Sequence, residues 1–134
     1  MYRVSEAIVV EGVYDKIKLS QFIDGVIFVT GGFSVFNNKA AQSSIRTLAE
    51  KTGIVILSDS DSAGIKIRNF IKQLSPDSKV LHAYVPEMKG REKRKEKDSK
   101  EGLLGVEGMS EDVIIDAIIK SGATVEGFSG TPKA

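Results

Sequence analysis

The sequence predicts an α/β fold, with an open sheet of about four mainly parallel strands and helices on both faces. Short apolar runs alternate along the chain with longer segments in which apolar residues recur at helical spacing. The runs are apolar at consecutive positions, which is typical of strands covered by helices on both sides, as in a parallel sheet. The alternation and the two-sided hydrophobicity together favour this class.

Four segments carry the strand pattern, and each is short and largely apolar. The second segment ends in two glycines, which favour a turn. The expected strands are 7–11 (AIVVE), 25–32 (GVIFVTGG), 54–58 (IVILS) and 79–85 (KVLHAYV).

Two helices are expected before the third of these strands. The first covers 13–22, with Val13, Ile17 and Gln21 on one helical side. The second covers 39–51, where apolar residues recur at helical spacing, and Gly53 supplies a stop signal.

Two more helices follow later in the chain. One ends before Pro76, and the other covers 110–122 with Ser110 as its N-cap. The tail, 123–134, has no periodicity and is expected to be loose, which leaves one domain over 1–122. The apolar stripe of the earlier helix consists of Ile67, Phe70, Ile71 and Leu74.

The length and composition describe one cytoplasmic domain. A chain of 134 residues fits one domain, and 41% hydrophobic with 28% charged residues is typical of a globular protein. No apolar run is long enough to span a bilayer, and the N-terminal residues turn charged too soon for a signal peptide. The absence of cysteine fits a reducing compartment and excludes thiolate metal sites. We therefore expect a cytoplasmic protein without membrane contact.

The charge is unevenly distributed, although the net charge is only +1. Segment 89–100 contains seven Lys or Arg against three acids, a net of +4, so the remaining residues sum to −3. Because phosphates attract Lys and Arg and release counterions on contact, this basic segment predicts a nucleic-acid partner; a solvated loop is the alternative. Its candidate nucleic-acid-binding residues are Lys89, Arg91, Lys93, Arg94, Lys95 and Lys97.

Acidic residues follow two of the expected strands. Glu11 closes the first strand, Asp15 lies one helical turn later, and a pair, Asp59 and Asp61, follows the third strand. In an open parallel sheet, ligands bind beyond the carboxyl ends of the strands. If these two strands are neighbours, four carboxylates share one edge and repel one another. A hard divalent cation such as Mg²⁺ relieves that repulsion, so the pattern predicts a metal site.

These acidic residues also have purely structural interpretations. Asp61 or Ser62 could serve only as the N-cap of the following helix. Glu11 with Gly12 could be no more than a strand end and a turn. The metal site is favoured by the combination of an acid at one strand end with a D-x-D at another.

A second loop is expected at the same edge of the sheet. Gly31 and Gly32 would form it, and their backbone N–H groups could approach a phosphate, although a glycine pair is also an ordinary turn. Three residues with functional side chains are not expected to be catalytic: His82 is expected to be a packed or edge residue, and Tyr84 and Phe28 are expected in the core.

Two motifs in this order resemble the Toprim domain, the metal-binding module of bacterial primases, topoisomerases, recombination-repair proteins and some small nucleases. They are VVEGVYD at 9–15 and ILSDSDSAG at 56–64, which match E-G-x-x-D and D-x-D-x-x-G at strand ends. A third block, LLGVEGMSEDVIIDAI at 103–118, is similar to the M-five ribonucleases, which mature the precursor of 5S ribosomal RNA in bacteria. Primases and topoisomerases do not share that block.

The resemblance implies a Rossmann-like Toprim catalytic domain that hydrolyses phosphodiester bonds with Mg²⁺, for which Mn²⁺ can substitute. Asp15 would support the site, and Glu107 would complete it from the third block. The implied substrate is structured RNA, in particular a ribosomal RNA precursor, with a ribosomal protein as a further candidate partner. The implied catalytic residues and metal ligands are Glu11, Asp59 and Asp61.

The chain departs from the ribonuclease pattern at several positions. Ser60 stands where that family usually has proline, Ser62 and Ala63 replace an aromatic–proline pair, and Gly108 replaces histidine. The family's C-terminal RNA-gripping region has no counterpart in these 134 residues. A metal-dependent endoribonuclease is the first interpretation. The alternative is a noncatalytic or regulatory Toprim module that binds nucleic acid or a nucleotide in a DNA-processing assembly. A metal-free phosphate-binding protein is disfavoured because four acids would repel the phosphate.

Overall fold

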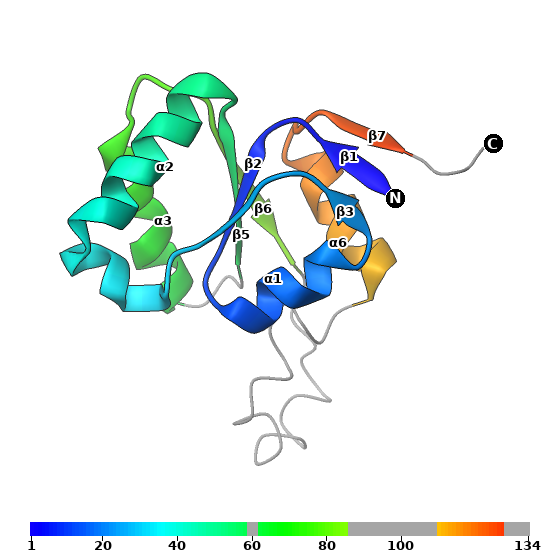
Figure 1. The fold of residues 1–134 in the computed structure, drawn as a ribbon, viewed down its shortest axis with the longest axis horizontal. Coiled ribbons are helices and arrows are strands. Elements are labelled where there is room, and N and C mark those ends of the chain that lie inside the picture. Colours follow the sequence, from blue (N-terminus) through cyan, green and yellow to red (C-terminus); the bar gives the residue numbers. More distant parts are fainter. Residues whose placement is uncertain (59–61, 86–109, 128–134) are drawn as a thin grey trace, which may run out of the picture.

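The structure is a computed structural model that describes residues 1–58, 62–85 and 110–127. Its helices and strands alternate along the chain as predicted (Figure 1). In chain order the elements are β1 (Tyr2–Val4), β2 (Ala7–Val10), α1 (Val13–Ser20), β3 (Ile23–Asp24), β4 (Ile27–Val29), the 3₁₀ helix η1 (Gly32–Asn37), α2 (Lys39–Lys51), β5 (Ile54–Ser58), α3 (Ser62–Leu74), β6 (Val80–Tyr84), α6 (Glu111–Lys120) and β7 (Val125–Gly127).

The main sheet has four parallel strands in the order β4-β2-β5-β6. Strand β2 pairs with β5 in a register that sets Val9 opposite Ile56. Strands β5 and β6 pair over five positions, from Ile54 opposite Val80 to the carboxyl ends of both strands. The predicted fold class is therefore confirmed, and the first and third predicted strands are neighbours.

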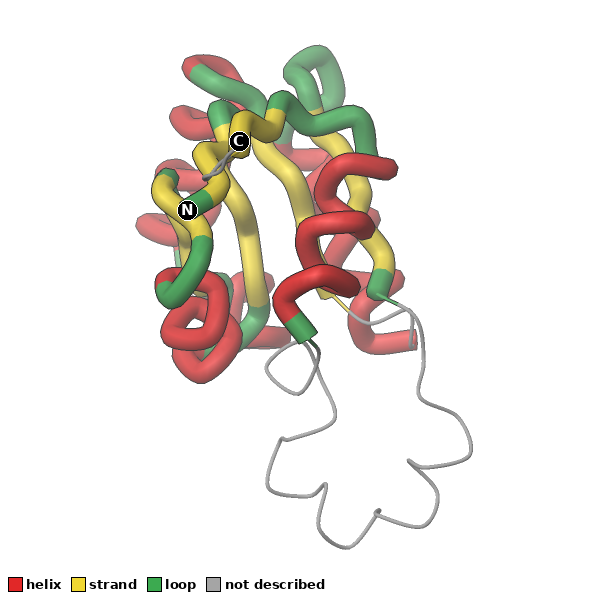
Figure 2. Tube along the Cα trace, turned by 90° about the vertical axis from the view of Figure 1, so that its right-hand side faces the viewer, coloured by secondary structure: helices red, strands yellow, loops and turns green. Residues whose placement is uncertain are grey.

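Helices cover both faces of this sheet and enclose a core on each (Figure 2). Successive side chains of a strand point to opposite faces. Ile8 and Val10 of β2 therefore pack with residues of α1 and α6, whereas Ala7 and Val9 pack with residues of α2 and α3. In the described part of the chain, no helix has the length and apolar character needed to cross a membrane.

Side-chain caps fix the starts of two helices. The Asn38 side chain accepts a hydrogen bond from the Ala41 N–H at 3.0 Å, so α2 begins at the predicted residue. Ser110 Oγ accepts from the Val113 N–H at 3.3 Å, which confirms the predicted cap of α6. The end of α2 is marked by Gly53, whose φ of +82° lies in the left-handed region that favours glycine.

Helix α1 turns to the core a different side from the one that carries Val13 and Ile17. Val13 and Ile17, which the periodicity groups on one helical side, are 55% and 52% exposed, while Leu19 is fully buried. Phe22, just after the helix, packs in the same core as Leu19. An eight-residue helix has few packing positions, and its orientation follows the apolar residues near its end, where the chain turns into β3.

A second, three-stranded sheet was not predicted. Its order is β3-β1-β7, with β1 parallel to β3 and antiparallel to β7. It lies on the same side of the main sheet as α1 and α6 (Figure 1), and Val4, Ile23 and Val125 join their core. The expectation of a loose tail over 123–134 is therefore wrong for the residues of β7, because pairing with β1 orders them; 128–134 lie outside the described residues.

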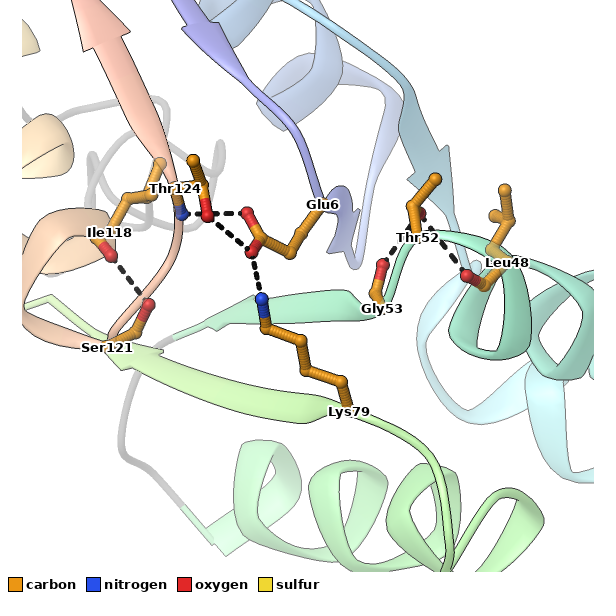
Figure 3. A network of polar contacts seen from close by, with 8 residues as sticks. All are labelled: Glu6, Leu48, Thr52, Gly53, Lys79, Ile118, Ser121 and Thr124. Atoms are coloured by element: carbon orange, nitrogen blue, oxygen red, sulfur yellow. Dashed lines mark hydrogen bonds and ion pairs between the residues drawn. The ribbon is translucent and has the colours of Figure 1, made fainter.

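A buried carboxylate connects the two sheets (Figure 3). Glu6, between β1 and β2, is 1% exposed and forms an ion pair with Lys79 Nζ at 2.5 Å. Its other contacts come from Thr124, whose backbone N–H and hydroxyl donate at 2.9 and 3.1 Å. Lys79 directly precedes β6 of the main sheet, and Thr124 directly precedes β7 of the small sheet. The Glu6 side chain therefore holds the starts of these two strands together.

Candidate metal and nucleic-acid site at the carboxyl edge

The switch point of the main sheet, where the strand order reverses, lies between β2 and β5. After β2 the chain enters α1 on one face, and after β5 it enters α3 on the opposite face. Two adjacent parallel strands whose following loops diverge in this way form the crevice in which α/β proteins bind ligands. The carboxyl ends of both strands lie at the lower edge of the sheet in Figure 1. We call this the carboxyl edge.

Glu11 occupies the carboxyl edge directly after β2 and is partly exposed. Its backbone carbonyl accepts a hydrogen bond from the Gly31 N–H at 2.8 Å, which holds the loop after β4 beside it. The predicted position of Glu11 at a strand end is therefore confirmed, while its catalytic role stays a prediction.

Asp15 caps the helix that begins after Glu11. Its Oδ2 accepts a hydrogen bond from the Gly12 N–H at 3.1 Å. The carboxylate also lies in the first turn of α1, where negative charge interacts favourably with the helix dipole. In the described structure Asp15 thus fixes the turn between β2 and α1. Its supporting role in the metal site stays a prediction.

The loop of Gly31 and Gly32 has the left-handed backbone that favours glycine, with φ of +79° and +66°. A Cβ at Gly31 would come within 2.5 Å of Ser34 Oγ. Gly31 N–H donates to the Glu11 carbonyl, and Gly32 N–H donates to Thr30 Oγ1 at 3.2 Å. A phosphate at this loop would have to share or replace these bonds, so phosphate contact by the two N–H groups stays a prediction.

Several predicted site residues lie outside the described residues: Asp59, Asp61, Glu107 and the whole basic segment 89–100. Among the described residues, no group of three or more His, Cys, Asp or Glu is placed to hold a metal ion. The described part of the site supplies Glu11, whose carboxylate oxygens are the donors Mg²⁺ prefers, beside the strand that leads into Asp59. Of the predicted ligands the structure thus describes one carboxylate, and the metal stays a prediction.

A buried arginine that the sequence interpretation missed lies under this edge. Arg68 of α3 is 2% exposed. Its Nη1 donates to the Ile56 carbonyl at 3.0 Å, and its Nη2 donates to the carbonyls of Ser58 at 3.0 Å and Ala83 at 2.6 Å. The guanidinium therefore contacts the carboxyl ends of both β5 and β6. The available signal was its spacing: four residues before Arg68, Gly64 is buried, and three residues after it, Ile71 is buried.

His82 and Tyr84 of β6 lie beside this guanidinium. Arg68 Nη1 is 3.2 Å from His82 Nδ1, and because arginine only donates, Nδ1 accepts and the ring is neutral. Burial lowers the pKa of His82, and the charges of Arg68 and Lys72 lower it further. The Tyr84 ring lies 4.0 Å from Arg68 Cζ.

Two packing expectations had different outcomes. Tyr84 is 52% exposed, so its assignment to the core was wrong, because β6 forms one end of the strand order and leaves the ring uncovered on one side. Phe28 packs against the core on the side of α2 and α3, as expected.

The sheet order, the acid at the switch point and the sequence motif define a Toprim-type α/β domain. The Toprim domain family matches residues 5–84, and the chain belongs to this family. It is similar to ribonuclease M5 of Fusobacterium nucleatum subsp. nucleatum, with 32% identity over 119 residues, which cover 89% of this chain and 59% of the relative. Ribonuclease M5 of Clostridium botulinum is 32% identical over 115 residues, or 86% of this chain and 57% of that protein. The chain thus spans somewhat more than half the length of these relatives.

A solved structure supports the fold assignment. The small TOPRIM domain protein from Bacillus stearothermophilus aligns with a TM-score of 0.56 and 22% identity. The alignment covers 92% of this chain and 91% of that structure. The likeness therefore extends over the main sheet and its covering helices.

Proposed function

We propose that this chain is the catalytic Toprim domain of a divalent-metal-dependent endoribonuclease that cleaves structured precursor RNA, of the type that matures 5S ribosomal RNA. One observation carries the proposal: Glu11 lies at the switch point of the sheet, beside the strand that leads into the D-x-D of Asp59 and Asp61. Similarity to ribonucleases M5 over nearly nine-tenths of the chain supports the choice of RNA.

In the proposed site, acidic residues would hold the metal. Glu11, Asp59 and Asp61 would hold Mg²⁺ or Mn²⁺, with Glu107 as a further acidic group. When bound, the metal polarises a phosphate and lowers the pKa of a water molecule. Asp15 holds the turn after β2 through the N–H of Gly12, the residue next to Glu11.

The RNA partner is expected to contact the basic segment 89–100, whose net charge of +4 attracts phosphates. A ribosomal RNA precursor is the proposed substrate, a ribosomal protein is a candidate partner, and the cytoplasm is the proposed location. These assignments follow the resemblance to the ribonuclease family and the absence of cysteine.

The proposal can be tested with one conservative variant and a matched control. Glu11→Gln keeps the shape of the side chain and removes its charge, so it should bind a double-helical RNA precursor about as well as wild type and cleave it hardly at all. Glu50→Gln makes the same exchange at an exposed position of α2 and should cleave at the wild-type rate. Cleavage by wild type should require Mg²⁺ or Mn²⁺ and stop with EDTA.

Two outcomes would contradict the proposal. Full cleavage by Glu11→Gln would remove the catalytic role from this carboxylate. Tight RNA binding by wild type without cleavage at any metal concentration would favour the noncatalytic Toprim module.

A further inference from the structure

Burying the guanidinium of Arg68 has a high desolvation free energy. Desolvating a charge is unfavourable unless hydrogen bonds satisfy it, and an apolar side chain of similar volume would fill the space at lower cost. Three strand carbonyls and the His82 ring nitrogen receive its N–H groups at 2.6–3.2 Å. So many contacts on one buried cation indicate that its position is tightly defined.

Sheet stability alone does not account for this arginine. Strands β5 and β6, whose ends it connects, already pair in register over all five of their residues. Their buried side chains are held by the cores on both faces. The additional link from α3 contacts the middle residue of each strand, Ile56 and His82. It also reaches toward their carboxyl ends, at Ser58 and Ala83.

The same link fixes both flanks of the D-x-D segment. Ser58, whose carbonyl accepts from Arg68 Nη2, directly precedes Asp59 in the chain. Arg68 itself belongs to α3, which begins at Ser62, directly after Asp61. One side chain therefore sets the distance between the residue before the D-x-D and the helix after it.

We propose that Arg68 is a positioning residue for the metal-binding carboxylates, an inference that rests on the proposed metal site. It holds Ser58, which precedes Asp59, and helix α3, which follows Asp61, in a fixed relation to each other. The Tyr84 ring and the His82 nitrogen orient the guanidinium for this task.

The test is Mn²⁺ titration of the whole chain without RNA. Arg68→Lys keeps the charge but loses the planar fork that reaches several carbonyls at once. Its Kd for Mn²⁺ should rise by roughly 10- to 100-fold, the usual loss when a group that orients metal ligands is removed. Arg46→Lys, at an exposed position of α2, should stay within about twofold of wild type by the same measure. Saturating Mn²⁺ should restore cleavage by Arg68→Lys, which a general loss of structure would not allow.

A milder pair of variants covers the case in which Arg68→Lys does not fold. Tyr84→Ala removes the exposed ring beside the guanidinium and should weaken Mn²⁺ binding severalfold, whereas Tyr84→Phe keeps the ring and should bind as wild type does. Wild-type Mn²⁺ affinity in a folded Arg68→Lys, or in Tyr84→Ala if Arg68→Lys does not fold, would overturn the positioning role. If wild type binds no Mn²⁺, the proposed metal site fails, and the positioning role fails with it.

Discussion

Removing the buried carboxylate of Glu6 should be the most destabilising single change that the structure predicts at the junction of its two sheets. The change Glu6→Ala deletes the acceptor of the Thr124 N–H and hydroxyl and the partner of Lys79. Its effect should appear in the free energy of unfolding rather than in the rate of catalysis. The three residues precede strands β2, β6 and β7, whereas the candidate site lies after strands, at the carboxyl edge.

The contacts set the size of the effect. A single hydrogen bond to a charged acceptor is worth about 1.5–3 kcal/mol. Because Thr124 is exposed, its N–H and hydroxyl can return to water, so its two bonds to the 1% exposed Glu6 should together contribute only about 1.5–3 kcal/mol. The Lys79 side chain is 49% exposed, so its ammonium can return to water, and the ion pair should add less than about 1 kcal/mol. We expect Glu6→Ala to lower the free energy of unfolding by roughly 2–4 kcal/mol.

Chemical denaturation of wild type, Glu6→Ala and Glu6→Gln measures this directly. Glu6→Gln should lose about half as much, because the amide oxygen still accepts one bond from Thr124. Glu126→Gln, at an exposed position of β7, should change the free energy of unfolding by less than about 0.5 kcal/mol.

The acid dependence adds an independent check. Burial raises the pKa of Glu6, but the hydrogen bonds from Lys79 and Thr124 outweigh it and leave the pKa below its ordinary value of 4.5. The stabilisation is therefore complete above pH 4.5 and is lost as the pH falls through the folded pKa. The gap between wild type and Glu6→Gln should close in that acid range. A loss under about 0.5 kcal/mol for Glu6→Ala, or a gap that stays constant in acid, would refute the reasoning.

Three further predictions concern the candidate site. Changing Asp59 and Asp61 together to Asn should abolish Mn²⁺ binding in a titration without lowering the metal-free Tm, because two repelling charges are removed; a large fall in Tm would instead indicate that Asp61 caps α3. The pKa of His82 is lowered from 6.5, so below that pH the unfolded chain takes up a proton that the folded chain resists, and the free energy of unfolding should decline from pH 7 to pH 5. In His82→Gln that part of the decline should disappear, and an unchanged slope would contradict the assignment. Replacing four basic residues of segment 89–100 by serine should flatten the log–log salt dependence of RNA binding by roughly 0.7–0.9 per lost contact. Cleavage at saturating RNA should stay intact. An unchanged slope would indicate that the segment is only a solvated loop. The replaced residues are Lys93, Arg94, Lys95 and Lys97.

The main sheet could be predicted from the sequence because its strands are apolar at consecutive positions. Strand β5 is buried at all five residues and its predicted bounds are confirmed, and the same holds for the bounds of α2. The small sheet could not be predicted in this way. Its strands have only two or three residues, and β1 pairs with β7 across nearly the whole chain, so no local pattern signals it.

The site was predictable to the extent that acids mark strand ends. Glu11 was recognised because it directly follows a buried strand, and the structure places it beside β5. Arg68 was missed because hydrophobic periodicity scores a charged residue as exposed, whereas here strand carbonyls compensate its burial. The polar partners that make such burial possible are distant in sequence and appear only in the folded chain.

The pairing of β1 with β7 brings residues near the two ends of the described chain together, so the domain can be circularly permuted. Gly127, at the end of β7, lies opposite Tyr2, at the start of β1, in an antiparallel ladder. A short linker between these two residues would therefore close a β-hairpin, and the exposed turn at Pro76 and Asp77, before β6, offers a place for new termini. Such a circular permutant makes the pairing of β1 with β7 local and the pairing of β5 with β6 long-range, so the same two sheets should form with the long-range contact moved from the small sheet to the main one.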